Sequence, residues 1–226
     1  MKIDKTLFII TGTTQGLGFD IFNQLSTISE NIVTINRSPF EYKNNINFDI
    51  SDIDNIEKSL LSKLNKLTKS YENLVLILNA SIIEPVKEIG NYETHDIIKI
   101  VNVNILSSMI LANFMVNQNK KGIVLNVSSG GIDFDFEGLG LYTATKISTH
   151  KFFSISNIEN SNIEFINFDS SSMDTQMTAS LKDKNNHFQV ASRDYLMAKT
   201  RDKTFTSTKD SATKLLKIII NKINKR

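Results

Sequence analysis

The sequence predicts an α/β fold in which helices cover both faces of a doubly wound parallel sheet. Short apolar segments alternate with longer stretches of helical period along almost the whole chain, a pattern typical of repeated βα units. The apolar segments are nearly continuous in hydrophobicity, as in parallel strands that are buried on both faces. The first segment also runs directly into a glycine-rich turn, which is where such a fold begins its first helix.

About six strands are expected, and helices connect most of them. The predicted strands are Leu7–Thr11, Ile32–Asn36, Ile46–Phe48, Leu74–Asn79, Ile123–Val127 and Ile163–Phe168. The predicted helices are Leu17–Ile28, Asp52–Tyr71, about Glu93–Asn119, Tyr142–Glu159 and a last helix from about Thr208 to the end. Because no apolar segment follows the last helix, a seventh strand is not expected.

The composition favours one globular domain over residues 1–226. Hydrophobic residues make up 40% and charged residues 22% of the chain, and at this length a single core can bury most of the apolar surface. The polar segment from Thr175 to Phe205 interrupts the pattern and is too long for an ordinary connection. Such segments are lids or disordered loops. We expect a substrate lid at about 175–205, closed by Met177, Phe188 and Met197.

Several classes of function find no support in the composition. The absence of cysteine excludes disulfides and thiolate–zinc sites, and His95, His150 and His187 lack metal-ligand spacing, so no metal is expected. The net charge of +2 indicates no nucleic-acid partner, and the lysine-rich end is interpreted as a solvated helix face. The longest apolar run, Leu74–Leu78, is far shorter than the about 20 residues that span a membrane. With no signal-peptide cleavage site, we expect a cytoplasmic protein.

A glycine-rich turn joins the first strand to an amphipathic helix, with the sequence Thr11-Gly12-Thr13-Thr14-Gln15-Gly16-Leu17-Gly18. Glycines here permit a tight turn, close approach of the backbone to a pyrophosphate and close packing of the helix on the sheet. The helix amino terminus adds free N–H donors for the phosphates. An ordinary βα turn is the alternative. We expect a dinucleotide to bind through Gly12, Thr13, Gln15, Gly16, Leu17 and Gly18.

The end of the second strand bears on which dinucleotide binds. An acidic residue there would hold the 2′-hydroxyl of NAD, whereas an arginine accommodates a 2′-phosphate, and the chain has Asn36 followed by Arg37. A charge-assisted contact contributes about 1.5–3 kcal/mol, so NADP(H) is the expected cofactor; a solvated arginine is the alternative. Further contacts are expected at the carboxyl ends of the third and fourth strands, from Asp49, Ile50, Asn79, Ala80 and Ser81.

A second group of candidate residues follows the fifth strand. Ser128 and Ser129 come directly after it, and Tyr142 and Lys146 are four residues apart, on one face of a helix. A free phenol has a pKa of about 10, and a neighbouring ammonium and a cationic nicotinamide both favour the phenolate. We therefore expect Lys146 to adjust Tyr142 for acid–base catalysis and Ser129 to hydrogen-bond the substrate oxygen.

With Thr-Gly-x-x-x-Gly-x-Gly, Asn-Ala, Ser and Tyr-x-x-x-Lys in this order, the chain resembles the short-chain dehydrogenases/reductases over nearly its whole length. The resemblance implies a Rossmann fold and hydride transfer from a nicotinamide. It implies Tyr142 as the general acid in reduction, Lys146 as its tuner and ribose anchor, and Ser129 as the stabiliser of the carbonyl. Tyr142 and Lys146 are therefore expected to contact the cofactor as well. It also implies that Thr175 meets the nicotinamide carboxamide.

The resemblance further implies a catalytic asparagine on the long helix, which interrupts helix hydrogen bonding and holds a water on a proton relay to the lysine. The segment Val101-Asn102-Val103-Asn104-Ile105 offers two candidates. Asn104 matches the family pattern better than Asn102.

Within the family, four short strings are most similar to the benzil reductases, NADPH-dependent carbonyl reductases related to sepiapterin reductase. The strings are Thr11–Gly18, Thr34–Ser38, Met109–Leu111 and Met173–Met177. A small ketone or diketone is therefore the expected substrate. Phe134 and Phe136 either pack in the core or favour an aromatic or apolar carbonyl, and the acidic residues around them argue against an anionic one.

Three departures from the family pattern affect these expectations. Asn-Asn-Ala-Gly appears as Leu78–Ser81, so Ser81 adds a side chain where the backbone normally approaches the cofactor. Pro-Gly after the sixth strand appears as Ser170–Ser171, so we expect a less rigid loop. The usual seventh strand helps to build a tetramer, and without it we expect a homodimer through the two longest helices. Two other functions stay open: the same chemistry on a keto-sugar or another polar intermediate, and a non-catalytic NADP-binding regulator.

Overall fold

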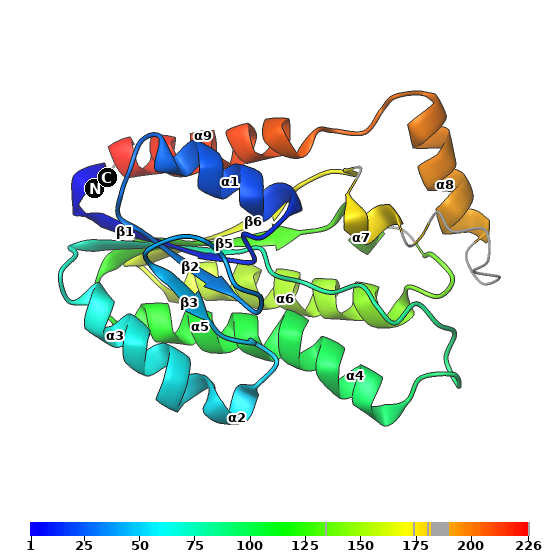
Figure 1. Ribbon diagram of the computed structural model, residues 1–226, viewed down its shortest axis with the longest axis horizontal. Coiled ribbons are helices and arrows are strands. Elements are labelled where there is room, and N and C mark those ends of the chain that lie inside the picture. The colour runs from blue at the N-terminus through cyan, green and yellow to red at the C-terminus, as the bar shows by residue number, and fades with distance from the viewer. Residues whose placement is uncertain (134, 174, 180, 182–189, 226) are drawn as a thin grey trace.

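Six parallel strands form one sheet in the order β3-β2-β1-β4-β5-β6 (Figure 1). This computed structural model describes residues 1–133, 135–173, 175–179, 181 and 190–225. The strands are β1 (Thr6–Thr11), β2 (Ile32–Asn36), β3 (Asn45–Asn47), β4 (Asn73–Leu78), β5 (Lys121–Ser128) and β6 (Ile163–Asp169). Each begins and ends within two residues of its expected bounds. The doubly wound parallel sheet is confirmed, and the described part of the chain holds no seventh strand.

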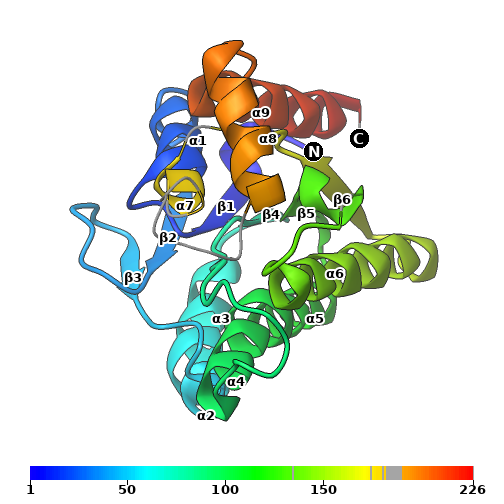
Figure 2. The ribbon, with the colours of Figure 1, turned by 90° about the vertical axis from the view of Figure 1, so that its right-hand side faces the viewer.

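Alternating side chains of the central strands build a hydrophobic core on each face of the sheet. In β1, Leu7 and Ile9 face one core, whereas Phe8 and Ile10 face the other. Figures 1 and 2 show the helices in two layers that cover these faces. Two helices cover the second core, α1 (Gly16–Ser26) and α9 (Thr208–Lys225). The first core is covered by α2 (Ile53–Asn55), α3 (Ser62–Thr68), α5 (Ser107–Asn117) and α6 (Gly140–Glu159).

Two of the expected long helices contain a stretch of π-helix. The helix expected over Asp52–Tyr71 consists of α2, the π-helical η2 (Ile56–Leu61) and α3. The helix expected over Glu93–Asn119 consists of α4 (Thr94–Val101), the π-helical η3 (Asn102–Leu106) and α5. Such bulges are frequent at functional sites, and η3 contains Asn104.

The helix of residues 94–117 is the one long, apolar helix in the described chain that has the length and composition to cross a membrane. A core helix passes the same test, and several of its side chains, among them Leu111 and Met115, are packed in the first hydrophobic core. Its hydrophobicity therefore has an explanation within the fold.

The segment between β6 and α9 contains helices where a long irregular loop was expected. These are the short α7 (Gln176–Ala179) and α8 (Val190–Arg201), both beyond the carboxyl edge of the sheet (Figure 2). Residues Met173 and Thr206 form an isolated parallel bridge that joins the two ends of the segment. Phe134, Asp174, His187 and Phe188, about which the sequence raised expectations, lie outside the described residues.

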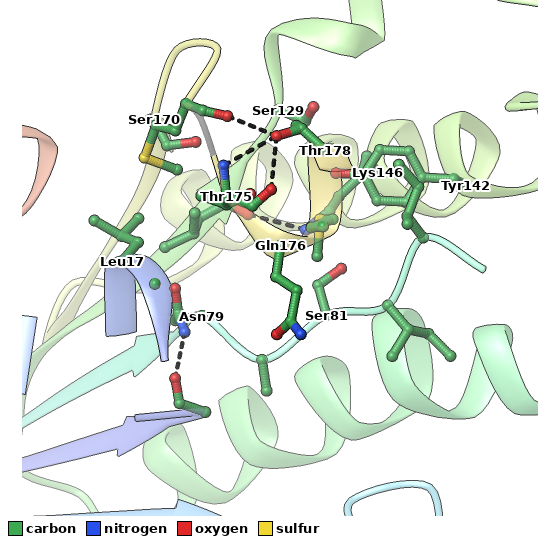
Figure 3. A pocket seen from close by; sticks show the side chains of 18 of the residues that line it. Leu17, Asn79, Ser81, Ser129, Tyr142, Lys146, Ser170, Thr175, Gln176 and Thr178 are labelled. Carbon is green, nitrogen blue, oxygen red and sulfur yellow. Dashed lines mark hydrogen bonds between the residues drawn. The ribbon is translucent and has the colours of Figure 1, made fainter. Parts of the chain in front are cut away.

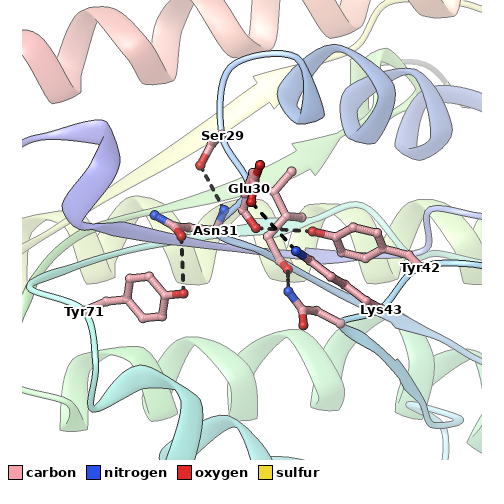
Figure 4. Close-up of polar contacts among 8 residues, drawn as sticks. Ser29, Glu30, Asn31, Tyr42, Lys43 and Tyr71 are labelled. Atoms are coloured by element: carbon pink, nitrogen blue, oxygen red, sulfur yellow. Dashed lines mark hydrogen bonds and ion pairs between the residues drawn. The ribbon is translucent and has the colours of Figure 1, made fainter.

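The strand order reverses between β1 and β4. In open α/β sheets, ligands bind outside the carboxyl ends of the strands at this point. At the amino edge, polar contacts join the segments that precede the strands (Figure 4). The Tyr71 hydroxyl donates to Asn31 Oδ1 over 3.4 Å, the Tyr42 hydroxyl donates to the Glu30 carbonyl over 3.4 Å, and the Lys43 ammonium lies 3.8 Å from the Glu30 carboxylate. The carboxyl edge is therefore where a ligand is expected to bind.

Candidate active site

A cavity of about 690 Å³ lies at the carboxyl edge of the sheet. Its lining combines the turn after β1, the ends of the following strands, and residues of α6, α7 and α8. Of the residues expected at the site, those that line the cavity are Gly12, Gln15, Gly16, Leu17, Asn36, Arg37, Asp49, Ile50, Asn79, Ala80, Ser81, Ser129, Tyr142, Lys146 and Thr175. Thr13, Gly18 and Asn104 lie behind this lining.

Close packing explains two glycines of the turn after β1. A Cβ atom on Gly18 would lie 1.9 Å from the Gly12 carbonyl oxygen and 2.4 Å from Asn79 Nδ2. Gly12 has a φ of +72° and packs against Ala80. Asn79 Nδ2 donates to the Gly12 carbonyl over 2.7 Å, and the Thr11 hydroxyl accepts the backbone N–H groups of Asn79 and Ala80. The turn is therefore held against the end of β4.

The amino terminus of α1 fits the pyrophosphate of a dinucleotide. No side chain caps this helix, because Gln15 at its N-cap is extended and makes no side-chain cap hydrogen bond. Gly16 has a φ of +58°, and a Cβ there would meet no atom within 4 Å. The turn thus presents uncapped N–H groups beside open space, which is the arrangement that binds phosphate at a helix terminus.

Asn36 has a bracing role at the end of β2. Its Oδ1 accepts the Thr13 backbone N–H over 2.7 Å, and its Nδ2 donates to the Thr13 hydroxyl and to Asn45 Oδ1. Asn36 is 3% exposed and these bonds use its amide hydrogens. The side chain therefore holds the glycine turn to β2 and β3, while the residue itself still borders the cavity.

The next residue, Arg37, is exposed at the mouth of the cavity. Its guanidinium makes no ion pair with any described residue. On the neighbouring strand, Asp49 Oδ1 accepts both the backbone N–H and the hydroxyl of Ser51, at 2.9 and 2.8 Å. Thr14 and Ser38, which the sequence did not single out, line the same part of the cavity.

Ser129, Tyr142 and Lys146 converge at the other end of the cavity (Figure 3). Tyr142 and Lys146 come from the first two turns of α6, and Ser129 directly follows β5. The Lys146 ammonium donates to the Val127 carbonyl over 3.1 Å and lies 5.8 Å from the centre of the Tyr142 ring. The fold therefore brings together the serine, tyrosine and lysine that the sequence selected.

Burial dominates the protonation of this group. Burial lowers the pKa of Lys146 to about 8. It raises the pKa of Tyr142, and a hydrogen bond with the Ser129 side chain acts in the opposite direction. The expected lowering of the Tyr142 pKa by Lys146 is not among the effects that the protein alone exerts. A raised pKa keeps the phenol protonated at neutral pH, which suits a proton donor.

Asn104, in the π-helical η3, connects this group to the end of β4. Its Oδ1 accepts the Ser81 hydroxyl over 3.0 Å and the Ile82 N–H over 2.9 Å. Its Nδ2 donates to the Ile82 carbonyl and to the Thr145 hydroxyl. Asn102 instead donates to the Ser51 carbonyl. Of the two candidates, Asn104 is therefore the one directed toward the site, and Ser81 bonds to it.

The loop after β6, which we expected to be less rigid, is hydrogen-bonded at three consecutive residues. Asp169 Oδ1 accepts the Ser171 N–H over 2.8 Å, the Ser211 hydroxyl donates to the Ser170 carbonyl over 2.9 Å, and the Thr206 N–H donates to the Ser172 carbonyl over 3.0 Å. Ser171 has a φ of +60°, so it adopts the conformation for which the family pattern has glycine. Hydrogen bonds thus replace the stiffness of Pro-Gly.

An apolar cluster borders the cavity beside Tyr142. Its buried members are Ile83, Leu139 and Leu181, and packed against them are Val86, Phe136, Tyr142, Met177, Tyr195 and Phe205. The Phe136 and Tyr195 rings are 5.5 Å apart between centroids. Phe136 therefore packs in this cluster and also lies in the wall of the cavity.

Sequence reasoning chose the wrong face of α8. Met197 is 45% exposed, whereas Tyr195 and Lys199, one helical turn apart, line the cavity. The Tyr195 hydroxyl lies 3.2 Å from Ser172 Oγ, and the Lys199 ammonium lies 5.2 Å from the Tyr195 ring centre. The four-residue spacing of Tyr195 and Lys199 places them on one face of α8. Because α8 is polar, the sequence did not indicate that this face borders the cavity.

The histidines and acidic residues form no metal centre in the described chain, where no group of three His, Asp or Glu side chains is placed to hold an ion. His95 is exposed next to Asp96, and His150 Nδ1 lies 3.3 Å from Ser128 Oγ.

The chain is similar to known proteins over most of its length. The model of the short chain dehydrogenase family matches residues 6–186. A benzil reductase ((S)-benzoin forming) from Bacillus cereus is 31% identical over 160 residues, which are 64% of this chain and 64% of that protein. A benzil reductase of the same description from Bacillus subtilis (strain 168) is 22% identical over 189 residues, 78% of each chain. The chain thus spans less than two thirds of the first of these relatives.

The fold is also similar to solved structures. A short chain dehydrogenase/reductase from Saccharomyces cerevisiae superimposes with a TM-score of 0.81 at 18% sequence identity, covering 96% of this chain and 90% of that one. At this level of identity the likeness concerns the fold.

Proposed function

Because the chain belongs to the short-chain dehydrogenase family, and is thus an oxidoreductase, we propose that it reduces a small ketone or diketone to an alcohol with NADPH. The observation that carries this proposal is the convergence of Ser129, Tyr142 and Lys146 at one end of a cavity whose other end fits a dinucleotide. Fold alone would not support an activity, but these side chains are the groups that carbonyl reduction needs.

A nicotinamide dinucleotide held at the glycine turn would supply a hydride for the carbonyl carbon. The Tyr142 hydroxyl donates its proton to the carbonyl oxygen as negative charge develops there. The Ser129 hydroxyl holds the same oxygen by a hydrogen bond that strengthens as the charge grows. The raised pKa of Tyr142 keeps the proton available at neutral pH.

Lys146 and Asn104 support this proton transfer. The Lys146 ammonium is held by the Val127 carbonyl close to the Tyr142 ring, and its role in adjusting the tyrosine for proton transfer is part of the proposal. Asn104 fixes the Thr145 hydroxyl, which donates in turn to the Tyr142 carbonyl over 2.7 Å. The start of α6 is thereby tied to η3.

The family uses NAD or NADP, and the end of β2 supports NADP. Asn36, in place of an acidic residue, puts no negative charge near a 2′-phosphate, and its side chain is occupied by the turn. The Arg37 guanidinium at the cavity mouth can pair with the phosphate. Thr14 and Ser38 offer hydroxyl donors in the same region.

The apolar cluster beside Tyr142 favours an apolar carbonyl over a keto-sugar. A sugar would leave several hydroxyl groups against Ile83, Leu139 and Phe136, where each unpaired polar group is costly. Two relatives described as benzil reductases point in the same direction.

The proposal is tested by following NADPH oxidation with benzil, an aromatic 1,2-diketone, next to NADH and next to the Tyr142→Phe variant. We expect turnover with NADPH, weak turnover with NADH, and a loss of about 10²–10⁴-fold in the variant. NADPH binding, measured by its fluorescence, should be unchanged by Tyr142→Phe. If only keto-sugars were turned over, the proposed ketone or diketone substrate would be wrong. If NADPH bound but no compound of a broad carbonyl panel were reduced, the non-catalytic NADP-binding regulator would be favoured.

We also propose a homodimer through the two longest helices. Ile98 on α4 is 54% exposed, and Ile147 and Ile155 on α6 are 49% and 43% exposed. The helices α4 and α6 are in contact, so these exposed apolar side chains lie on neighbouring helices, and exposed apolar side chains on adjacent elements are of the kind found at interfaces. Light scattering should give twice the chain mass, and Ile98→Lys with Ile147→Lys should give the monomer.

A further inference from the structure

Three side chains of α6 contact three consecutive residues at the end of β5. Tyr142, Lys146 and His150 are four residues apart and therefore lie along one face of the helix. Tyr142 is hydrogen-bonded to the Ser129 side chain, and the Lys146 ammonium donates to the Val127 carbonyl. The third contact has no place in the proposed chemistry.

This third contact joins His150 to Ser128. His150 Nδ1 lies 3.3 Å from Ser128 Oγ. Ser128 is 5% exposed, and a buried hydroxyl that loses its partner is destabilising. The contact therefore constrains both the serine side chain and the end of the strand that carries it.

The backbone of His150 is fixed as well. Its carbonyl accepts Asn167 Nδ2 of β6 over 2.9 Å, and Asn167 Oδ1 accepts Asn126 Nδ2 of β5 over 2.9 Å. The chain of contacts thus leaves β5 at Asn126, passes through β6 and α6, and returns to β5 at Ser128. A closed polar network of this kind holds one geometry better than a single contact does.

We propose that His150 is a positioning residue for the reaction: through Ser128 it fixes the end of β5 and thereby the separation of Ser129 from Tyr142. The inference rests on the proposed function, because it assigns the purpose of this separation to catalysis. Its physical basis is that small errors in the placement of reacting groups cost large factors in rate.

The experiment is a double-mutant cycle with His150→Leu, Ser128→Ala and the two combined, with His150→Asn as the conservative variant. We expect each single variant to lower kcat about tenfold with the KM and dissociation constant of NADPH unchanged. The double variant should be no slower than either single one, since both remove the same contact. His150→Asn, which retains a polar group near Ser128, should recover most of kcat. Lys151→Ala, exposed on the same helix, is the control.

Amide hydrogen exchange of residues 126–133 provides a readout that needs no turnover. Exchange there should be faster in His150→Leu and Ser128→Ala, equally and without addition in the double variant. Additive effects, or faster exchange with an unchanged kcat in an active enzyme, would overturn the inference. If the wild-type protein turned over no carbonyl, the proposed function would be wrong. In that case, unchanged exchange of residues 126–133 in His150→Leu and Ser128→Ala would still show that His150 does not fix the end of β5.

Discussion

The two ends of the cavity differ in the parts of the chain that border them. At the dinucleotide end, the glycine turn and the uncapped N–H groups of α1 border the cavity, and the side chains of Asn36 and Asn79 brace this turn. At the chemical end, the surface is made of side chains such as Ser129 and Tyr142, with α7 and α8 covering it. At the dinucleotide end, we expect a substitution that changes the shape of the turn to lower both stability and binding. At the chemical end, we expect a substitution to raise stability and still abolish turnover.

The largest expected effect at the dinucleotide end is that of Gly18→Ala. The added Cβ would lie 1.9 Å from the Gly12 carbonyl oxygen, so the turn must move against β4. We expect a loss of about 3 kcal/mol in the free energy of unfolding, together with loss of dinucleotide binding. Urea denaturation and a fluorescence titration with NADPH measure the two.

Gly16→Ala is the matched control, because a Cβ there meets no atom of the protein within 4 Å. Its cost should be limited to the strain of a positive φ, about 1 kcal/mol. Equal losses for both glycines would contradict the view that packing, and not backbone conformation alone, selects Gly18.

At the chemical end, Lys146→Met should stabilise the protein while abolishing turnover. The fall in the pKa of Lys146 from 10.5 to about 8 corresponds to about 3 kcal/mol against folding. Loss of the bond to the Val127 carbonyl offsets about 1 kcal/mol, which leaves a net gain of about 2 kcal/mol at pH 7.

The pH dependence of this gain follows from the sign of the shift. Below pH 8 both folded and unfolded Lys146 are protonated, so the full cost of the buried ammonium is present. Between 8 and 10.5 only the unfolded chain keeps the proton, and wild-type stability from this group rises with pH. Unfolding measured at pH 7 and pH 10 should show the advantage of Lys146→Met disappear; a constant difference would refute the assignment.

The same contrast explains what the sequence could predict. Backbone-built features leave a local signature, so the turn Thr11–Gly18 and the strand that precedes it were predicted from glycine spacing and hydrophobicity. The pair Tyr142 and Lys146 was predictable because helical periodicity places them on one face. Asn36 was predicted as a cofactor contact from its position at the end of the second strand. Its bracing role was not predicted, because its contacts with Thr13 and Asn45 depend on how three strands align.

The wall contributed by α8 was not predictable. Its helix is polar, so hydrophobicity does not say which side faces the cavity; Met197 was predicted there, and Tyr195 was not singled out. The contacts of Tyr195 with Phe136 and Ser172 join segments that only the folded chain brings together. The hydrogen bond from the Ser81 hydroxyl to Asn104 Oδ1 also joins two segments that only the folded chain brings together.

Cofactor choice should depend on one exposed side chain of the dinucleotide end. Arg37→Ser removes the cation but no buried contact, so we expect NADPH to bind more weakly by about 1.5 kcal/mol, roughly tenfold. Binding of NADH should not change. Fluorescence titrations with both cofactors measure this, and Lys43→Ser, an exposed lysine paired with Glu30, is the control. Equal weakening of both cofactors would mean that Arg37 does not read the 2′-phosphate.

The smallest effect is expected in the loop that joins the two ends. Ser171 has a φ of +60°, which costs an L-residue about 1 kcal/mol. Ser171→Gly should therefore raise the free energy of unfolding by about 0.5–1 kcal/mol and leave turnover unchanged, because its N–H still donates to Asp169. Asn119→Gly, at a φ of 53°, should gain less, since asparagine tolerates this conformation. If Ser171→Gly instead slows turnover at unchanged stability, the serine side chain itself acts in the loop, and strain is not what distinguishes this loop from the glycine turn.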